Sequence, residues 1–194
     1  MTPVYLDEFV NSNEIADLIV EIDKFSTPSS LLGQQAQGFR TSATHYFLPP
    51  TELSSIIERR IDSTFSLPSI NGEPLQGQKY EIGQFFKPHH DFMHRNQHYY
   101  DRQLVFGGQR TWTVMIYLNA PAQGGETYFP KLDITITPQS GKLIAWNNLK
   151  SCGNPNYDTL HEGKPVIEGT KYILTRWYRE NPYPHQSVLE QLNI

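Results

Sequence analysis

Apolar residues recur at helical spacing in two segments of the first third of the chain. In the first segment they are Ile15, Leu18, Ile19 and Ile22. Asn11 and Glu14, three residues apart, form a candidate capping box at the start of this segment. The spacing therefore predicts an amphipathic helix over residues 11–22.

The second helical segment begins at Thr51, directly after the Pro49-Pro50 pair. Its apolar residues are Leu53, Ile56, Ile57 and Ile61. Thr51 is a suitable N-cap, so the pattern predicts a helix over residues 51–62. Because isolated helices of this length are marginally stable, we expect both helices to cover one face of a sheet.

From Tyr80 onward the pattern changes to short runs that alternate between the two sides of the backbone. Residues 111–119 alternate with a period of two, which is typical of a strand. Further strands are predicted at residues 127–129, 134–137, 142–146 and 171–180, with turn residues between them. Many short strands with regular turns favour a sandwich or jelly roll. The fold class is therefore predicted to be mainly β with flanking helices.

The length of 194 residues fits one domain over residues 1–194. Within it we expect a helical N-terminal support at 1–75 and a β core with the functional site at 76–180. Residues 181–194 are predicted to form a polar C-terminal extension.

Charge and cysteine content narrow the possible partners. The formal net charge is −4 and no Lys/Arg run is present, which argues against nucleic acid and anionic membranes as partners. The N-terminus lacks the pattern of an export signal, and no apolar stretch approaches membrane-spanning length. The single Cys152 fits a reducing compartment. We therefore expect a cytoplasmic protein.

Candidate chemistry lies in the His89-His90-Asp91 segment and in the distant His161. Residues two apart on a strand point to the same side, so His89 and Asp91 can face one metal while His90 points away. Two imidazoles and one carboxylate leave three coordination positions open, as in non-haem iron(II) oxygenases. A surface histidine beside a solvated carboxylate is the plainer alternative for His-x-Asp alone, and an open zinc site of a hydrolase is another.

Lys171 opens an alternating strand on which it shares one face with Ile173, Thr175 and Trp177. One interpretation is an edge-strand lysine that discourages aggregation. The other is a buried ammonium that pairs with the far carboxylate of a dicarboxylate cosubstrate such as 2-oxoglutarate (2OG). The apolar neighbours favour the second interpretation, since a buried charge is costly unless it is paired.

Several motifs in order resemble the prolyl 4-hydroxylases of the Fe(II)/2OG-dependent dioxygenase superfamily. The matching segments are Tyr80-x-x-Gly83-Gln84 leading into His89-x-Asp91, then Gly124-Gly125-Glu126-Thr127, then His161 followed by Gly169-x-Lys171-Tyr172. The resemblance spans most of the chain and includes Arg40-Thr41-Ser42. It implies a double-stranded β-helix, the jelly-roll fold shared with cupins.

The resemblance also implies a ligand set. His89, Asp91 and His161 would bind Fe(II), and Lys171 with Tyr80 would hold 2OG. O2 is the second cosubstrate, and ascorbate is a further cofactor to be tested. The expected reaction hydroxylates a prolyl residue in a peptide or protein and decarboxylates 2OG to succinate.

Further positions extend this implied site. Thr175 is a candidate for lining the 2OG pocket, with packing as its alternative role. Arg110 and Trp177 match family positions near the peptide substrate, although a strand-end arginine and a core tryptophan are equally credible structural residues. Residues 92–108 are long enough to form a lid over the substrate, or an ordinary surface loop.

One position departs from the family pattern. The family commonly has Tyr three residues before the first iron ligand, where this chain has Phe86. The ring remains and the hydroxyl is lost. This difference keeps open the same chemistry on a free amino acid or another small substrate. A catalytically silent jelly-roll binding module is an alternative from another class.

Overall fold

A computed structural model describes residues 2–29 and 38–184 of the chain. Its helices are α1 (Ser12–Phe25), α2 (Glu52–Phe65), η1 (Ser69–Asn71), α3 (Tyr100–Leu104) and η2 (Tyr157–Thr159). Its strands are β1 (Val4–Leu6), β2 (Thr27–Pro28), β3 (Ala43–Tyr46), β4 (Gln76–Tyr80), β5 (Phe86–His89), β6 (Arg110–Tyr117), β7 (Gln123–Gly124), β8 (Thr127–Phe129), β9 (Ile134–Ile136), β10 (Leu143–Asn147), β11 (His161–Gly163), β12 (Val166–Glu168) and β13 (Lys171–Arg179).

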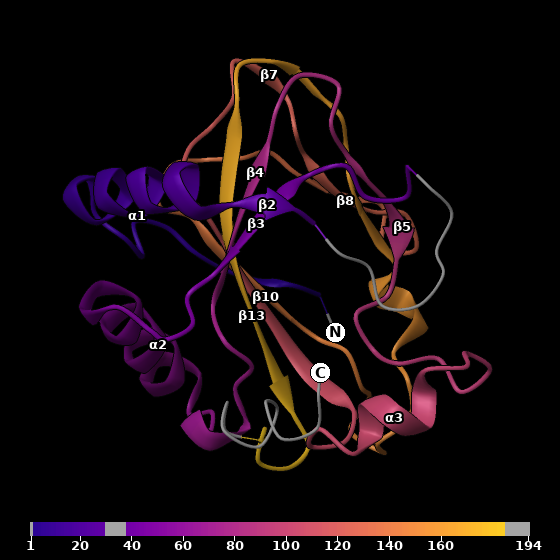
Figure 1. Cartoon of the computed structure of the whole chain (residues 1–194). Coiled ribbons are helices and arrows are strands. Elements are labelled where there is room, and N and C mark those ends of the chain that lie inside the picture. Colours follow the sequence, from indigo (N-terminus) through magenta and orange to yellow (C-terminus); the bar gives the residue numbers. More distant parts are fainter. Residues whose placement is uncertain (1, 30–37, 185–194) are drawn as a thin grey trace.

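The strands form two principal antiparallel sheets. The major sheet has the order β1-β10-β6-β13-β4-β3-β2, and the minor sheet has the order β5-β11-β8-β9. Strands β7 and β12 form a separate short pair. Figure 1 shows β13 running through the middle of the molecule, with α1 and α2 on one side and β5 and β8 on the other. The mainly β, jelly-roll fold expected from the sequence is confirmed.

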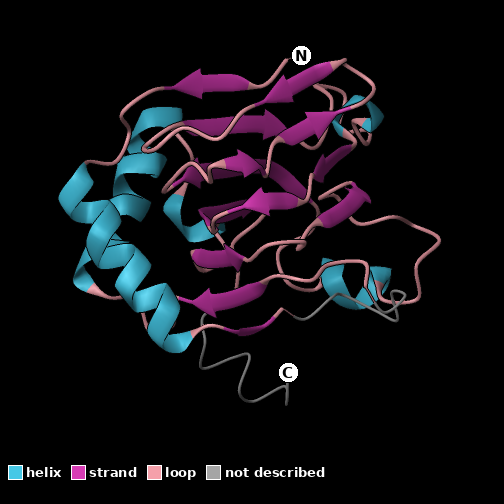
Figure 2. Ribbon diagram, turned by 90° about the horizontal axis from the view of Figure 1, so that it is seen from above, coloured by secondary structure: helices cyan, strands magenta, loops and turns pink. Residues whose placement is uncertain are grey.

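Both predicted helices are present and are capped by the expected residues. The Asn11 side chain accepts from the backbone N–H groups of Asn13 and Glu14, and the Glu14 carboxylate accepts from the Asn11 backbone, which completes the capping box. The Thr51 hydroxyl caps α2 by accepting from the Ser54 backbone N–H. Each helix extends about one turn beyond its predicted end. Figure 2 shows the two helices together on one side of the strands.

The alternation on β6 separates two apolar cores. One face of the major sheet packs against α1 and α2, and this core includes Leu18, Ile22, Ile57, Ile61, Val114, Ile116, Leu118 and Leu174. The opposite face turns toward the minor sheet, and that core includes Met115, Tyr117, Phe129, Ile144, Trp146 and Ile173. Because both faces of β6 are covered, its alternation separates two apolar environments rather than core from solvent.

The N-terminal segment contributes more than helices. It also supplies β1, which pairs with β10, and β3, which pairs with β4. These strands widen the major sheet at both edges. The predicted C-terminal extension lies mostly outside the described residues, which end at 184. No helix within the described ranges is long and apolar enough to cross a membrane.

Candidate metal and cosubstrate site

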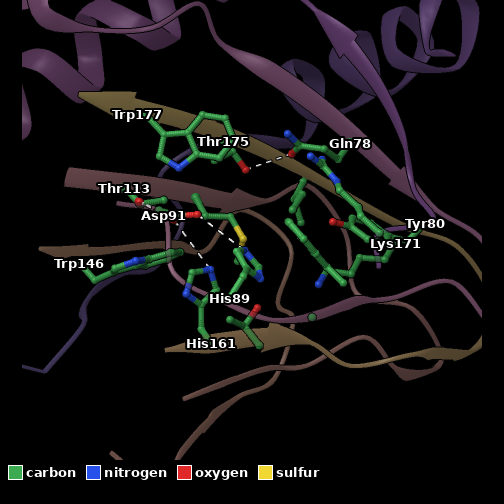
Figure 3. A pocket seen from close by; sticks show the side chains of 16 residues that line it. Gln78, Tyr80, His89, Asp91, Thr113, Trp146, His161, Lys171, Thr175 and Trp177 are labelled. Atoms are coloured by element: carbon green, nitrogen blue, oxygen red, sulfur yellow. Dashed lines mark hydrogen bonds and ion pairs between the residues drawn. The ribbon is translucent and has the colours of Figure 1, made fainter. Parts of the chain in front are cut away.

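A polar cluster lies within the otherwise apolar space between the two sheets (Figure 3). The minor sheet contributes His89 from β5 and His161 from β11, whereas the major sheet contributes Lys171 and Thr175 from β13. All four side chains line one cavity. Residues that are far apart in the sequence therefore meet because the sheets face each other.

His89, Asp91 and His161 come together with their ligand atoms all within 4.8 Å of one another. His89 and His161 are direct partners across the β5–β11 pair. The Nε2 atom of His89 lies 3.6 Å from Asp91 Oδ1, and the Nε2 atom of His161 lies 3.8 Å from Asp91 Oδ2. The strand ends at His89, so Asp91 lies in a bend rather than on the strand, yet it faces the same point.

Both imidazoles are oriented by backbone carbonyls. His89 Nδ1 lies 2.7 Å from the Lys87 carbonyl oxygen, and His161 Nδ1 lies 2.9 Å from that of Thr159. A carbonyl only accepts, so each Nδ1 carries the hydrogen and each Nε2 keeps a free lone pair. This is the support that metal-binding histidines usually have. His90, by contrast, is directed toward the Tyr157 carbonyl oxygen.

Hydrogen bonds also orient the Asp91 carboxylate. The Thr113 hydroxyl donates to Asp91 Oδ2 at 2.6 Å, and the Asn148 side-chain amide donates to the Thr113 hydroxyl oxygen at 2.9 Å. All three residues are buried. This chain of donors orients one carboxylate oxygen and leaves the other free.

The protonation states suit metal binding. Burial, reinforced by the neighbouring His161, lowers the pKa of His89 to about 3, which makes its imidazole neutral at physiological pH. Burial would raise the pKa of Asp91, but the two imidazoles, the Arg110 guanidinium and the Thr113 hydroxyl outweigh it and lower that pKa. A neutral imidazole beside an ionised carboxylate is the donor set that Fe(II) accepts. The residues therefore fit the metal.

Lys171 is a buried cation, and the charge of Glu126 acts on it without forming an ion pair. Its exposed fraction is 2%, and no ion pair joins it to an acidic side chain in the described part of the chain. Its Nζ atom lies 5.3 Å from the ring centroids of both Tyr80 and Tyr117. Burial lowers the pKa of the ammonium to about 7. An anionic group bound in this cavity would supply the missing partner, as a dicarboxylate such as 2OG would.

The strand face predicted for β13 lines the cavity as expected. Lys171, Ile173, Thr175 and Trp177 are all lining residues. Lys171 is the direct cross-strand partner of Tyr80 on β4. The Thr175 hydroxyl donates to Gln78 Oε1 at 3.0 Å, so it takes part in a buried polar contact rather than simple packing.

The cavity opens into an outer groove of about 580 Å³. The groove shares Arg40, Phe86, His89, Asp91 and Trp177 with the inner cavity. Aromatic side chains dominate its lining: Phe39, Tyr46, Phe86, Phe92, Tyr99, Phe106, Trp177 and Tyr183. A substrate in this groove would therefore approach the metal ligands along an aromatic wall.

Arg110 and Trp177 belong to one wall of the groove. Arg110 makes a two-pronged ion pair with Glu73, at 2.6 and 2.8 Å, and its guanidinium carbon lies 3.8 Å from the Trp177 ring centroid. Arg179 also donates to Glu73, at 2.5 Å. Glu73 therefore holds two arginines, and its pKa is lowered because these cations outweigh burial.

Phe86 packs directly on an iron-ligand candidate. Its ring stacks on the His89 imidazole with a centroid separation of 3.6 Å and an interplanar angle of 18°. The Arg40 guanidinium carbon lies 5.0 Å from the centroid of the Phe86 ring. Phe86 therefore helps to orient His89 by stacking and contacts Arg40 as well.

Four residues of the site were not singled out by the sequence patterns: Arg40, Glu73, Gln78 and Thr113. Of these four, only Arg40 belongs to a segment that resembles the family, Arg40-Thr41-Ser42. The segment 92–108 contains α3 and three buried apolar side chains, Phe92, Met93 and Phe106. Its movement as a lid stays a prediction.

Comparison with known proteins gives consistent matches. Residues 75–179 match the model of the 2OG-Fe(II) oxygenase superfamily. A relative from Acanthamoeba polyphaga mimivirus, provisionally classed as a prolyl 4-hydroxylase, is 28% identical over 93% of this chain and 75% of its own length. Prolyl 4-hydroxylase 2 of Arabidopsis thaliana is 32% identical over 74% of this chain, which spans 54% of the plant protein.

A solved structure is similar over nearly the whole chain. It is the viral collagen prolyl hydroxylase from Paramecium Bursaria Chlorella virus-1 in complex with 2OG. The two chains superpose with a TM-score of 0.73 and 28% sequence identity, covering 91% of this chain and 95% of the viral one.

Proposed function

Because this chain belongs to the 2OG-Fe(II) oxygenase superfamily, and is thus a 2OG-dependent dioxygenase that uses Fe(II), we propose that it hydroxylates a prolyl residue in a peptide or protein. In the overall reaction, 2OG, O2 and the substrate C–H group give succinate, CO2 and the hydroxylated product. The observation that carries the proposal is the His89, Asp91 and His161 cluster, which opens onto an aromatic groove. Iron, when bound, supplies the activation of dioxygen that side chains lack.

The chain's own residues position the reactants. His89 and His161 would offer their Nε2 atoms, and Asp91 would offer the carboxylate oxygen that Thr113 leaves free. A metal held by these three residues would keep coordination positions open for the cosubstrates. Lys171 would pair with the far carboxylate of 2OG, with Tyr80 beside it. Ascorbate would act as an auxiliary reductant.

The groove suits an extended peptide. Aromatic-lined grooves bind polyproline II segments because such segments are already ordered and present flat apolar rings. Trp177 and Phe86 line both the groove and the cavity, so they stand where a target proline would reach the metal. Apolar walls there would exclude water from the reaction. Arg110 would support this wall through its contact with Trp177.

A second candidate is the same chemistry on a free amino acid or another small substrate. Phe86 is the observation that favours it. The ring stacks on His89 and offers no hydroxyl to the groove. A peptide substrate would therefore lack one hydrogen bond near the residue that is oxidised.

The test measures succinate formation. Purified protein is loaded anaerobically with Fe(II) and 2OG, O2 is admitted, and succinate is measured with and without proline-rich peptides. His161→Ala is the inactive comparison, because it removes one candidate ligand. We expect wild-type turnover that peptide stimulates, with one oxygen atom added to proline by mass spectrometry.

Three other results would contradict parts of this proposal. Succinate without stimulation by any peptide would contradict the peptidyl substrate and favour the small-substrate candidate. Absence of succinate from wild type in every condition would contradict catalysis and favour a binding module. Equal turnover by His161→Ala would contradict the ligand assignment.

A further inference from the structure

Arg40 is a cation of the groove with no carboxylate partner among the described residues. Its Nε atom donates to the Ser42 hydroxyl at 2.8 Å and its Nη2 atom to the Thr44 hydroxyl at 3.2 Å. Within the described ranges, its Nη1 atom donates to no group and no carboxylate forms an ion pair with it. The side chain is half-buried and lines both the groove and the inner cavity.

The other two arginines of the groove are already neutralised in part. Arg110 and Arg179 share the carboxylate of Glu73. Hydroxyls orient the Arg40 guanidinium but leave its full charge, since neither Ser42 nor Thr44 is ionised. A guanidinium held in one orientation with a free N–H edge is preorganised for a carboxylate.

The groove carries positive charge, whereas the whole chain has a negative net charge. Leaving its histidines and tyrosines aside, the arginines that line it are Arg40, Arg110 and Arg179, and the carboxylates are Glu73 and Asp91. Asp91 belongs to the metal site, so Glu73 alone offsets three arginines. The chain as a whole has a formal net charge of −4. A cationic groove on an anionic protein concentrates anionic ligands at that place.

The position of Arg40 indicates which part of a bound substrate it would contact. Its guanidinium lies over one side of Phe86, and the His89 imidazole stacks on the same ring at 3.6 Å. Arg40 is therefore one aromatic ring away from a metal-ligand candidate. A group bound to Arg40 would belong to the residue next to the one that is oxidised, not to a remote part of the peptide.

We propose that Arg40 binds a carboxylate carried by the substrate beside the oxidised residue, so that the preferred peptides have Asp or Glu next to proline. This proposal rests on the proposed function and names its substrate class. An aspartate or glutamate side chain is the favoured source, because the proposed substrate is a prolyl residue within a peptide or protein. A free C-terminal carboxylate is the other source of the same chemistry.

The experiment compares capped proline-rich peptides that differ only in the residue beside proline: Glu, Gln or Lys. A fourth peptide ends in a free carboxylate directly after proline. The readout is kcat/KM from succinate formation and from oxygen added to the peptide. With wild type, we expect the Glu peptide to exceed the Gln peptide by about tenfold or more, the effect of one charge-assisted hydrogen bond. The preference should shrink as salt is raised.

Two substitutions test the residue. Arg40→Gln should abolish the preference for Glu over Gln, and Arg40→Glu should make the Lys peptide the best of the three. Arg59→Gln is the matched control, because Arg59 is an exposed arginine on α2. This control should keep both the wild-type preference and the turnover without peptide.

The outcomes separate this proposal from the function on which it rests. Equal stimulation by Glu and Gln peptides would overturn the Arg40 proposal and leave prolyl hydroxylation intact. A Glu preference that persists in Arg40→Gln would overturn the assignment to this residue. A strong response to the free C-terminal carboxylate alone would overturn the side-chain source. Succinate that no peptide stimulates would overturn both proposals.

Discussion

The hydroxyl of Thr113 is the contact through which the major sheet orients Asp91. Thr113→Val keeps the shape of the side chain and removes the donor at 2.6 Å from the carboxylate. We expect Fe(II) affinity to fall by about 10- to 100-fold, the usual effect of losing such a support. Anaerobic calorimetric titration with Fe(II) measures this change.

The matched control is Thr111→Val on the same strand. The Thr111 hydroxyl donates to the Tyr178 carbonyl oxygen and lies outside the cavity lining. Its Fe(II) affinity should equal that of wild type. Equal affinities for all three proteins would show that Thr113 does not orient the ligand.

Lys171 should make the binding of 2OG dependent on pH. In the free protein burial lowers the pKa of its ammonium to about 7. The protonated form binds the carboxylate, so affinity is constant below that pH and falls above it. We expect the Kd of 2OG to rise about tenfold per pH unit between roughly 7 and 9. Anaerobic titration of the iron-loaded protein at several pH values tests this.

Lys171→Met supplies the comparison. It keeps an unbranched apolar side chain of nearly the same length and removes the titrating group. Its affinity for 2OG should be weak and should lack the slope that starts near pH 7. An unchanged slope in this variant would assign the pH dependence to another group.

At the level of single residues, sequence reasoning found side chains whose spacing carries information. His89 and Asp91 are two residues apart, and Lys171 begins an alternating strand that continues through Thr175. Thr113 and Asp91 are 22 positions apart, and their contact exists only because the two sheets face each other. Glu73 likewise acquires its role from Arg110 and Arg179, and Arg40 acquires its place in the groove from its contact with Phe86. Such long-range contacts cannot be predicted from a local sequence pattern.

Helix α2 is attached to the major sheet by buried charges as well as by apolar contacts. Arg176 of β13 lies 3.2 Å from Asp62 of α2, and the Tyr178 hydroxyl donates to the same carboxylate at 2.5 Å. Arg176→Met would leave Asp62 buried without its cation. We expect the free energy of unfolding to fall by roughly 3 kcal/mol, as measured by urea denaturation.

A control and a rescue accompany this substitution. Arg59→Met removes an exposed arginine from α2 and should change stability by less than about 0.5 kcal/mol. Adding Asp62→Asn to Arg176→Met removes the unpaired charge and should recover part of the loss. A stable Arg176→Met protein would mean that the apolar contacts alone hold the helix.

At the level of elements, long periodic segments were predicted well, whereas the short N-terminal strands β1 and β3 were not. Residues 111–119 contain a full alternation, and β6 is found there. Strand β1 has three residues and β3 has four, too few to establish a period. Their strand conformation comes from pairing with β10 and β4. The polar, half-buried sequence of β3 gives no independent signal.

On the scale of the whole molecule, the bound groups would connect the two sheets. The candidate iron ligands come from the minor sheet side, whereas Lys171 belongs to the major sheet. Fe(II) with 2OG at about 100 times its Kd should add about 2.7 kcal/mol to the stability of the fold. For a chain of this size that raises Tm by roughly 5 to 11 °C. Anaerobic differential scanning calorimetry tests this, and a chelator should reverse the shift.

His161→Ala is the comparison for this measurement. The variant should unfold at the same temperature with and without Fe(II) and 2OG. A wild-type Tm that does not change on addition of Fe(II) and 2OG would contradict binding between the sheets. An equal rise in the variant would indicate that the metal binds elsewhere.

The pairing of His89 opposite His161 has a consequence for folding. Side chains alternate between the faces of a strand, so a slip of one residue between β5 and β11 would turn one imidazole to the wrong face. Such a mispaired chain would direct side chains of one strand to the opposite face and could not bind the metal through all three ligands. Iron binding would therefore stabilise the correct pairing of β5 with β11 relative to this register error.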